Sequence, residues 1–149
     1  MTTSAGRTDV RRRPVQVFAL VVGVVFLVVG VLGFIPGITT DFDQLRFAGP
    51  GSQARIFGLF EVSVLHNLVH LLFGALGLLA ARRGGGARGY LVVGGFAYLL
   101  LWVYGSVIHE DSGTNFIPLN PADNLLHLFL GAGMVLLGVL GTVLERKRA

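Results

Sequence analysis

The sequence predicts an all-α membrane protein, a four-transmembrane-helix bundle built as two repeated helical hairpins. Hydrophobic residues make up 53% of the 149-residue chain and charged residues only 13%, and the mean hydropathy is +0.73. Soluble domains carry about 25% charged residues. Four apolar stretches are also long enough to cross a hydrocarbon core of about 30 Å, which requires about 20 helical residues. We expect one domain over residues 15–144, flanked by basic tails at 1–14 and 145–149.

The first helix is expected at about residues 15–34. Three arginines at positions 11–13 precede it, as basic residues also precede a secretory signal peptide. A signal peptide has an apolar core of about 7–15 residues followed by a small-residue cleavage site. This run is longer and ends in a Gly-Phe-Ile-Pro-Gly segment. We therefore expect a retained transmembrane helix.

The connection that follows, residues 35–62, is long and rich in apolar residues. Its segment 54–60 is expected to lie along the membrane interface or to cap the bundle. The second helix is expected at about 64–81. A run of three glycines, Gly84 to Gly86, is predicted to form a loose turn before the third helix, at about 89–108.

The third helix carries Trp102 and Tyr104 near its outer end, where aromatic residues often form a belt at the membrane interface. His109 follows as a solvated interface residue. The loop at 111–120 has turn-forming residues around a small apolar core. We expect it to deliver the cap of the fourth helix, at about 121–144, and the alternative is a lid over the polar residues described below.

The distribution of charge predicts that both termini are cytoplasmic, because basic residues mark that side of a membrane protein. Ten of the twelve basic residues lie in the two tails and in the connection at 82–88. Six of the eight acidic residues lie in the other connections or at the helix ends beside them. The pI near 10.3 therefore comes from basic residues next to the membrane, which set the topology and contact anionic lipid. We expect no nucleic acid partner. The absence of cysteine excludes disulfides, iron–sulfur clusters and covalently attached haem.

A polar motif occurs twice, as HNLVHLLFGA at residues 66–75 and as DNLLHLFLGA at residues 123–132. Ser63 and Asn120 are suitable N-caps for the two helices. They place His70 and His127 both at the seventh helical residue, about 9 Å from the helix start. Because both helices run from outside to inside, the hairpins would be related by an axis along the membrane normal.

Polar and ionisable side chains are costly inside a bilayer, so these residues are the candidate site. Glycines one turn further along each helix indicate close helix packing, which places the polar stripe against protein instead of lipid. The candidate polar cluster in the outer leaflet comprises His66, Asn67, His70, Asp123, Asn124 and His127.

Several roles are open for this cluster. A network of interhelical hydrogen bonds would give it a structural or interaction role, which we take as the main hypothesis. Zinc or copper bound by His66, His70, His127 and Asp123 is one alternative, and haem b held axially by His70 and His127 is another. Proton, ion or small-ligand handling that also uses Glu61 is a third. Asn67 stands where a zincin motif needs glutamate, so we predict no catalytic residues and no enzyme.

Three segments, at residues 65–74, 102–105 and 115–127, resemble a bacterial, mainly actinobacterial, family of four-helix integral membrane proteins known as domain of unknown function 4383. The resemblance covers most of the chain from the first helix to the fourth. It implies a multi-pass protein of the bacterial cytoplasmic membrane, and it brings no activity, substrate or cofactor. The expected partners are the lipid bilayer and either another membrane protein or a second copy, with Gly23, Gly30 and Gly33 as a possible surface for self-association.

Overall fold

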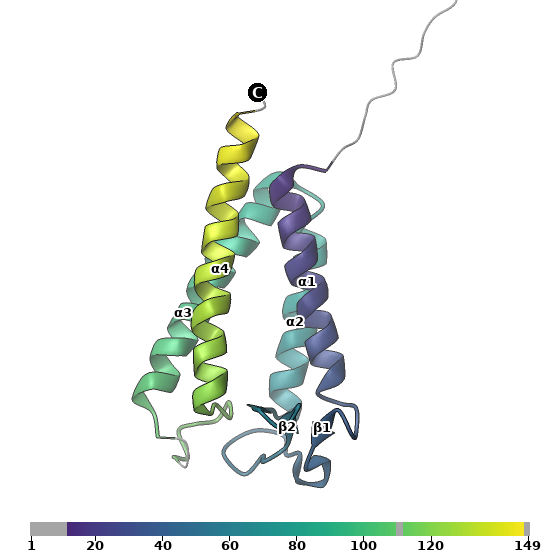
Figure 1. Cartoon of the computed structure of the whole chain (residues 1–149), viewed down its shortest axis with the longest axis vertical. Coiled ribbons are helices and arrows are strands. Elements are labelled where there is room, and N and C mark those ends of the chain that lie inside the picture. Colours follow the sequence, from purple (N-terminus) through teal and green to yellow (C-terminus); the bar gives the residue numbers. More distant parts are fainter. Residues whose placement is uncertain (1–11, 110–111, 148–149) are drawn as a thin grey trace, which may run out of the picture.

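The computed structural model describes residues 12–109 and 112–147 and is mostly helical. Its four helices are α1 (Pro14–Leu32), α2 (Val64–Ala80), α3 (Gly84–Val107) and α4 (Pro121–Arg146) (Figure 1). Helices α1, α3 and α4 are long and apolar enough to cross a membrane, and α2 is a shorter apolar helix of 17 residues. Five charged residues used for the topology prediction lie outside the described residues: Arg7, Arg11, Glu110, Asp111 and Arg148.

The helices form two pairs. Helix α1 packs mainly on α2 and α3 mainly on α4, with fewer contacts between the pairs. Glycines allow close approach of the backbones within each pair. A Cβ atom at Gly74 would lie 2.8 Å from the carbonyl oxygen of Gly23, and one at Gly131 would lie 2.8 Å from the carbonyl oxygen of Gly95. Larger residues at these positions would force the paired helices apart.

The glycines of α1 face α2 instead of a free surface. Gly23 and Gly30 are buried, and a Cβ atom at Gly30 would lie 2.9 Å from the side chain of Leu71 in α2. The prediction that Gly23, Gly30 and Gly33 offer a surface for self-association is therefore wrong, because packing within the α1–α2 pair already uses them. Self-association through another surface stays a prediction.

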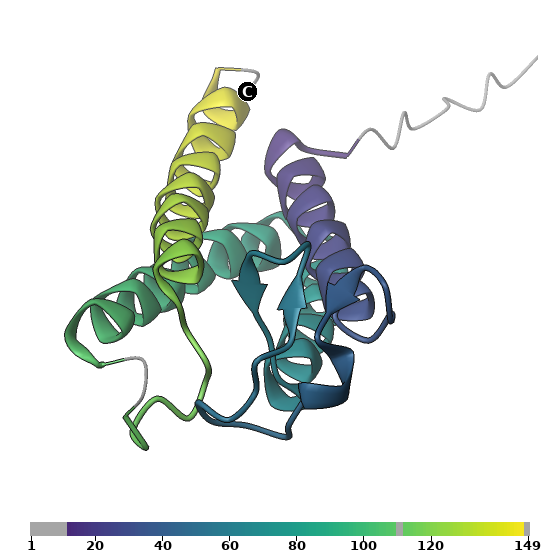
Figure 2. The same ribbon diagram turned by 60° about the horizontal axis from the view of Figure 1, so that its bottom comes forward.

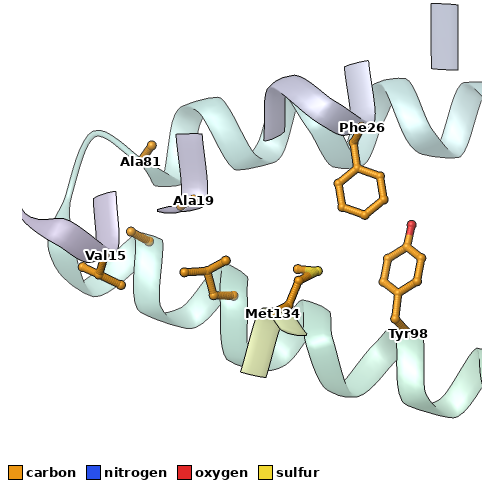
Figure 3. Close-up of a cluster of buried hydrophobic side chains, with 8 residues drawn as sticks. Val15, Ala19, Phe26, Ala81, Tyr98 and Met134 are labelled. Carbon is orange, nitrogen blue, oxygen red and sulfur yellow. The ribbon is translucent and has the colours of Figure 1, made fainter. Parts of the chain in front are cut away.

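A hydrophobic core joins the two pairs (Figure 3). The rings of Phe26 in α1 and Tyr98 in α3 point toward each other, with their centroids 5.2 Å apart. Large aliphatic side chains on all four helices remain exposed on the outside, as expected of helices that face lipid. The buried members of the core are Val15, Ala19, Phe26, Ala81, Ala87, Leu91, Tyr98 and Met134.

Three short strands follow α1 and precede α2 in the sequence. They lie at the end of the molecule opposite the start of α1 (Figure 1), and Figure 2 shows this end turned forward. Strands β1 (Thr39–Thr40), β2 (Arg55–Ile56) and β3 (Phe60–Glu61) form an antiparallel sheet in that order. Phe57 and Gly58 turn the chain between β2 and β3 with φ angles of 54° and 70°. The chain is thus not purely α-helical, and segment 54–60 is a β-hairpin that lies beside the helix ends.

Helices α2 and α4 begin where their caps predict. The Ser63 hydroxyl accepts a hydrogen bond from the His66 amide at 3.1 Å, and the Asn120 side chain accepts one from the Asp123 amide at 2.9 Å. Helix α3, in contrast, begins at Gly84 instead of residue 89. A Cβ atom at Gly86 would lie only 3.0 Å from the Ala80 carbonyl oxygen, so Gly86 lets the first turn of α3 fold closely onto the end of α2. The predicted loose turn is wrong for this reason.

Candidate functional site

The six residues of the predicted polar cluster lie in the first turns of α2 and α4, at the sheet end of the molecule (Figure 1). All are buried except Asn124, which is half-buried. The structure brings the three histidines together. The ring centroids of His66 and His70 are 4.5 Å apart and stacked, and those of His66 and His127 are 6.3 Å apart.

An aromatic residue of the paired helix covers each of the two deeper histidines. The ring of Phe26 in α1 stacks on His70 of α2 with a centroid distance of 5.5 Å. The ring of Tyr98 in α3 meets the edge of His127 of α4 at 5.3 Å. Both helix pairs therefore place a six-membered ring against an imidazole, stacked in the α1–α2 pair and edge-to-face in the α3–α4 pair.

A cavity of about 260 Å³ opens beside these rings. Among the residues that line it, none is Lys, Arg, Asp or Glu. Phe116 and Ile117, from the loop before α4, form part of its wall, so this loop both delivers the α4 cap and covers one side of the histidines. The full lining consists of Leu65, His66, Val69, His70, Tyr98, Leu101, Phe116, Ile117 and His127.

The three imidazoles differ in their hydrogen bonds. The Nδ1 atom of His70 lies 3.1 Å from the carbonyl oxygen of His66. Because a carbonyl only accepts, this contact favours the tautomer with the proton on Nδ1 and the lone pair on Nε2. The Nδ1 atoms of His66 and His127 are buried and make no hydrogen bond to any residue that the structure describes. A buried polar atom without a partner costs about 1–3 kcal/mol, and because the surface of the cavity is almost wholly apolar, these two atoms lie behind its wall.

Asp123 belongs to a different group of contacts. Its Oδ2 atom accepts hydrogen bonds from the backbone amide of Glu61 in β3 at 2.9 Å and from that of Asn120 at 3.2 Å. The Asn120 side chain in turn donates to the Leu59 carbonyl oxygen at 2.7 Å. Asp123 therefore ties the sheet to the start of α4. The candidate cluster is divided into a histidine group around the cavity and an Asp123 group at the helix cap.

A metal or haem site stays a prediction. Within residues 12–109 and 112–147, no group of three or more His, Cys, Asp or Glu side chains is arranged to hold a metal ion. Asp123, the predicted fourth ligand, already binds two backbone amides through Oδ2. The cavity of about 260 Å³ is also smaller than the pockets of about 300–1,000 Å³ that hold drug-sized ligands.

The two asparagines face their paired helices. The side chain of Asn67 fills the space where a Cβ atom of Gly33 in α1 would lie, and that of Asn124 fills the equivalent space at Gly105 in α3. Asn124 also donates from Nδ2 to the hydroxyl of Ser106 at 2.9 Å. Asn67 and Asn124 thus position α2 on α1 and α4 on α3, and neither lines the cavity.

A family model described as a domain of unknown function (DUF4383) matches residues 16–140. The chain belongs to the DUF4383 family. Neither a comparison with curated proteins nor a comparison with solved structures found a match. The DUF4383 match includes all six residues of the predicted cluster and all the residues that line the cavity.

Phe26 and Tyr98 are residues of the candidate site that sequence reasoning did not assign to it. They lie 72 residues apart, as do Gly23 and Gly95. An alignment of the first and third apolar stretches at this spacing would have revealed them. Few residues are identical between the two stretches. Matching positions such as Phe26 and Tyr98 share side-chain size and burial instead.

Proposed function

We propose that this protein is a multi-pass protein of the cytoplasmic membrane, in which all four helices cross the bilayer and both termini face the cytoplasm. At 1.5 Å per residue, the 17 residues of α2 extend about 25 Å, close to the thickness of the hydrocarbon core. The start of α1 and the end of α4 lie at one end of the molecule (Figure 1). Glu145 is there within 3.4 Å of Arg88 and 4.0 Å of Arg13, and the clustering of basic residues at this end supports its cytoplasmic location.

Single-cysteine variants test this topology, because the natural chain has no cysteine. Gln53→Cys lies at the sheet end and Lys147→Cys at the other, and both positions are exposed. In intact cells, a membrane-impermeant maleimide should label Gln53→Cys and should label Lys147→Cys only after permeabilisation. The opposite pattern would overturn the proposed orientation.

The two hairpins are proposed to be copies of one ancestral hairpin. Matched pairs of residues support this: Gly23 and Gly95 approach Gly74 and Gly131 respectively, and Phe26 and Tyr98 cover His70 and His127. The spacing is 72 residues for the pairs in α1 and α3, and 57 residues for those in α2 and α4. One parallel duplication with connections of different length accounts for both spacings.

The protein is proposed not to be an enzyme but to bind a small molecule in the cavity beside its three histidines. One observation carries this proposal: a cavity of about 260 Å³ without charged residues in its lining lies beside the three histidine rings, two of which keep a buried Nδ1 atom without a described protein partner. In a purely structural network these atoms would be paired with each other or with neighbouring residues. The structural role falls instead on the Asp123 group, which joins the sheet to α4.

Thermal unfolding in mild detergent separates binding from a structural role. His127→Phe keeps a ring against Tyr98, removes the ring nitrogens and adds one ring atom, which the neighbouring cavity has room for, so the variant should unfold at the same temperature as the natural protein or above it. Asp123→Ala is the matched control, because it removes the acceptor of two hydrogen bonds and should unfold at a lower temperature. If His127→Phe loses as much stability as Asp123→Ala, the histidines are structural and the binding proposal is wrong.

A further inference from the structure

We propose that a groove between α2 and α3 binds an anionic phospholipid, with one acyl chain in the groove and the phosphate on Arg82 and Arg83. The groove shares no residue with the lining of the histidine cavity, so the proposal goes beyond the proposed binding function and does not depend on it. Three observations carry it: a hollow apolar surface, two arginines without acidic partners, and the distance between these two features along α3.

The apolar surface is a groove of about 390 Å³ whose surface is wholly apolar. The ring of Phe73 in α2 lies so close to Gly94 of α3 that a Cβ atom there would be only 2.7 Å from it. Beside this ring, Val93 is 69% exposed on the outside of α3. A hydrocarbon chain seated in the groove would gain dispersion contacts with both helices. The lining consists of Phe73, Gly89, Tyr90, Val93, Gly94 and Ala97.

Two arginines lie near the end of this groove without an acidic partner. Residues 62–109, which include all of α2 and α3, contain no Asp or Glu. Arg82 and Arg83, between α2 and α3, are exposed, and no acidic side chain that the structure describes forms an ion pair with either. Arg88, in contrast, lies 3.4 Å from Glu145 of α4. A phosphate group would supply the missing counter-charge, since guanidinium groups bind phosphate through paired hydrogen bonds.

The distance along α3 matches the dimensions of a phospholipid. Gly89, where the groove begins on α3, follows Arg83 by six residues, which is about 9 Å along a helix axis. The headgroup layer on each side of a bilayer is about 5–8 Å deep. A lipid whose phosphate contacts Arg83 therefore has acyl chains that begin near Gly89. The groove then continues to Ala97, about 12 Å further along the helix.

The location of this end of the molecule favours an anionic lipid. The side chain of Gln16 in α1 donates a hydrogen bond to the Ala81 carbonyl oxygen at 2.9 Å, so the connection between α2 and α3 lies at the same end as the start of α1 (Figure 1). On the proposed topology this end meets the cytoplasmic leaflet. Anionic lipids give that leaflet a negative surface potential, which attracts basic residues beside the membrane.

A second copy of the chain is a less suitable occupant of the groove. Two copies in one membrane hold Arg82 and Arg83 at the same depth, so an interface through the groove brings like charges together. Glu145, the acidic residue that the structure describes at this end, already lies 3.4 Å from Arg88 and 4.0 Å from Arg13. Charge complementarity therefore favours a phosphate over another copy of this surface.

Native mass spectrometry of the delipidated protein in detergent tests the charge preference. Dioleoyl phosphatidylglycerol is the anionic probe and dioleoyl phosphatidylcholine the neutral one. We expect phosphatidylglycerol to bind about 30-fold more tightly, because each of two arginines contributes about a fivefold preference. Arg82→Gln with Arg83→Gln should abolish this preference. Arg146→Gln with Lys147→Gln removes the same charge from exposed positions of α4 and its C-cap and should keep it. Equal affinity for both lipids in the natural protein, or equal losses in the two double variants, would overturn the proposal.

Filling the groove tests the position of the acyl chain without changing the charge. In Gly89→Leu with Ala97→Leu, the Cβ position at Gly89 has no described atom beyond its own neighbourhood within 4 Å, and leucine favours a helix. This variant should fold and should lose the tight phosphatidylglycerol site. Gly133→Leu is the matched control, because its Cβ position in α4 is equally open and lies outside the groove. Tight binding that persists in the filled variant would place the lipid elsewhere and refute the proposal.

The same spectra distinguish the other occupants. Glycerol 3-phosphate, which has the phosphate but no acyl chains, should not displace phosphatidylglycerol at equal concentration, and displacement would indicate a site for a soluble phosphate compound instead. A dimer of the natural protein that becomes a monomer in the filled variant would indicate a second copy. Either result would contradict the proposal. His127→Phe should leave phosphatidylglycerol binding unchanged, so failure of this proposal leaves the proposed function of the histidine cavity standing.

Discussion

Replacing Gly131 by alanine tests how closely α3 and α4 pack, and two opposing effects decide the result. Alanine favours a helix over glycine by about 1 kcal/mol. Against this, a Cβ atom at Gly131 would lie 2.8 Å from the Gly95 carbonyl oxygen and 2.9 Å from the Leu99 amide nitrogen. Backbone atoms cannot rotate away, so the helices must separate until these distances exceed the 3.4 Å at which ordinary contacts begin.

Overpacking of this kind costs about 1–3 kcal/mol, and a clash with two backbone atoms belongs at the upper end of that range. With the propensity gain subtracted, we expect Gly131→Ala to lower the free energy of unfolding by about 2 kcal/mol. Gly133→Ala is the matched control on the same helix, because no described atom beyond its own neighbourhood lies within 4 Å of its Cβ position. That variant should gain up to about 1 kcal/mol.

Unfolding by SDS titration from mild detergent, followed by far-ultraviolet circular dichroism, measures both changes. Gly74→Ala should behave like Gly131→Ala, since its Cβ atom would lie 2.7 Å from the Leu27 amide nitrogen and 2.8 Å from the Gly23 carbonyl oxygen. If Gly131→Ala is as stable as Gly133→Ala, the packing argument is refuted. If only one of Gly74→Ala and Gly131→Ala is destabilised, the equivalence of the two hairpins is wrong.

Three further outcomes are expected. Asp123→Ala should lose about 2–4 kcal/mol of unfolding free energy because two backbone amides lose their acceptor, whereas Asp123→Asn, which keeps one oxygen, should lose less in the same titration. Gly33→Ala should be destabilising because its new methyl group overlaps the Asn67 amide, and adding Asn67→Ala should recover part of the loss in a double-mutant cycle. Protein purified without added metal should show no Soret band, and EDTA should leave its unfolding temperature unchanged, whereas stoichiometric metal that is lost in His66→Ala and His127→Ala would favour the metal hypothesis.

The parts of the site that the sequence predicts are those set by interactions within one helical turn. Ser63 and Asn120 cap their helices as predicted, because capping depends on residues two or three positions apart. Once both starts are known, the depth of His70 and His127 follows from the helical rise. The meeting of their rings around one cavity is consistent with that equal depth.

The parts that the sequence does not predict depend on contacts between distant segments. Strands of two residues, such as β2 and β3, are too short for alternation of apolar and polar residues to reveal. Gly84 to Gly86 are typical of a loop, yet they form the first turn of α3, where the close contact of Gly86 with the end of α2 favours a residue without a side chain. Local propensity gives way there to tertiary packing.

The difference between the proposed hairpin copies explains why the cavity has three imidazoles instead of two or four. His66 and Asp123 occupy equivalent positions, the third residue of α2 and of α4. The imidazole of His66 stacks on His70 and adds to the cavity wall, whereas the shorter carboxylate of Asp123 turns back to the cap and binds the Glu61 amide. This one difference between otherwise similar hairpins thus lets α4 hold the sheet through Asp123 and gives α2 an additional imidazole beside the cavity. Asp123→His should therefore weaken the fold without enlarging the site, because the equivalent space beside α4 already holds the β3 backbone.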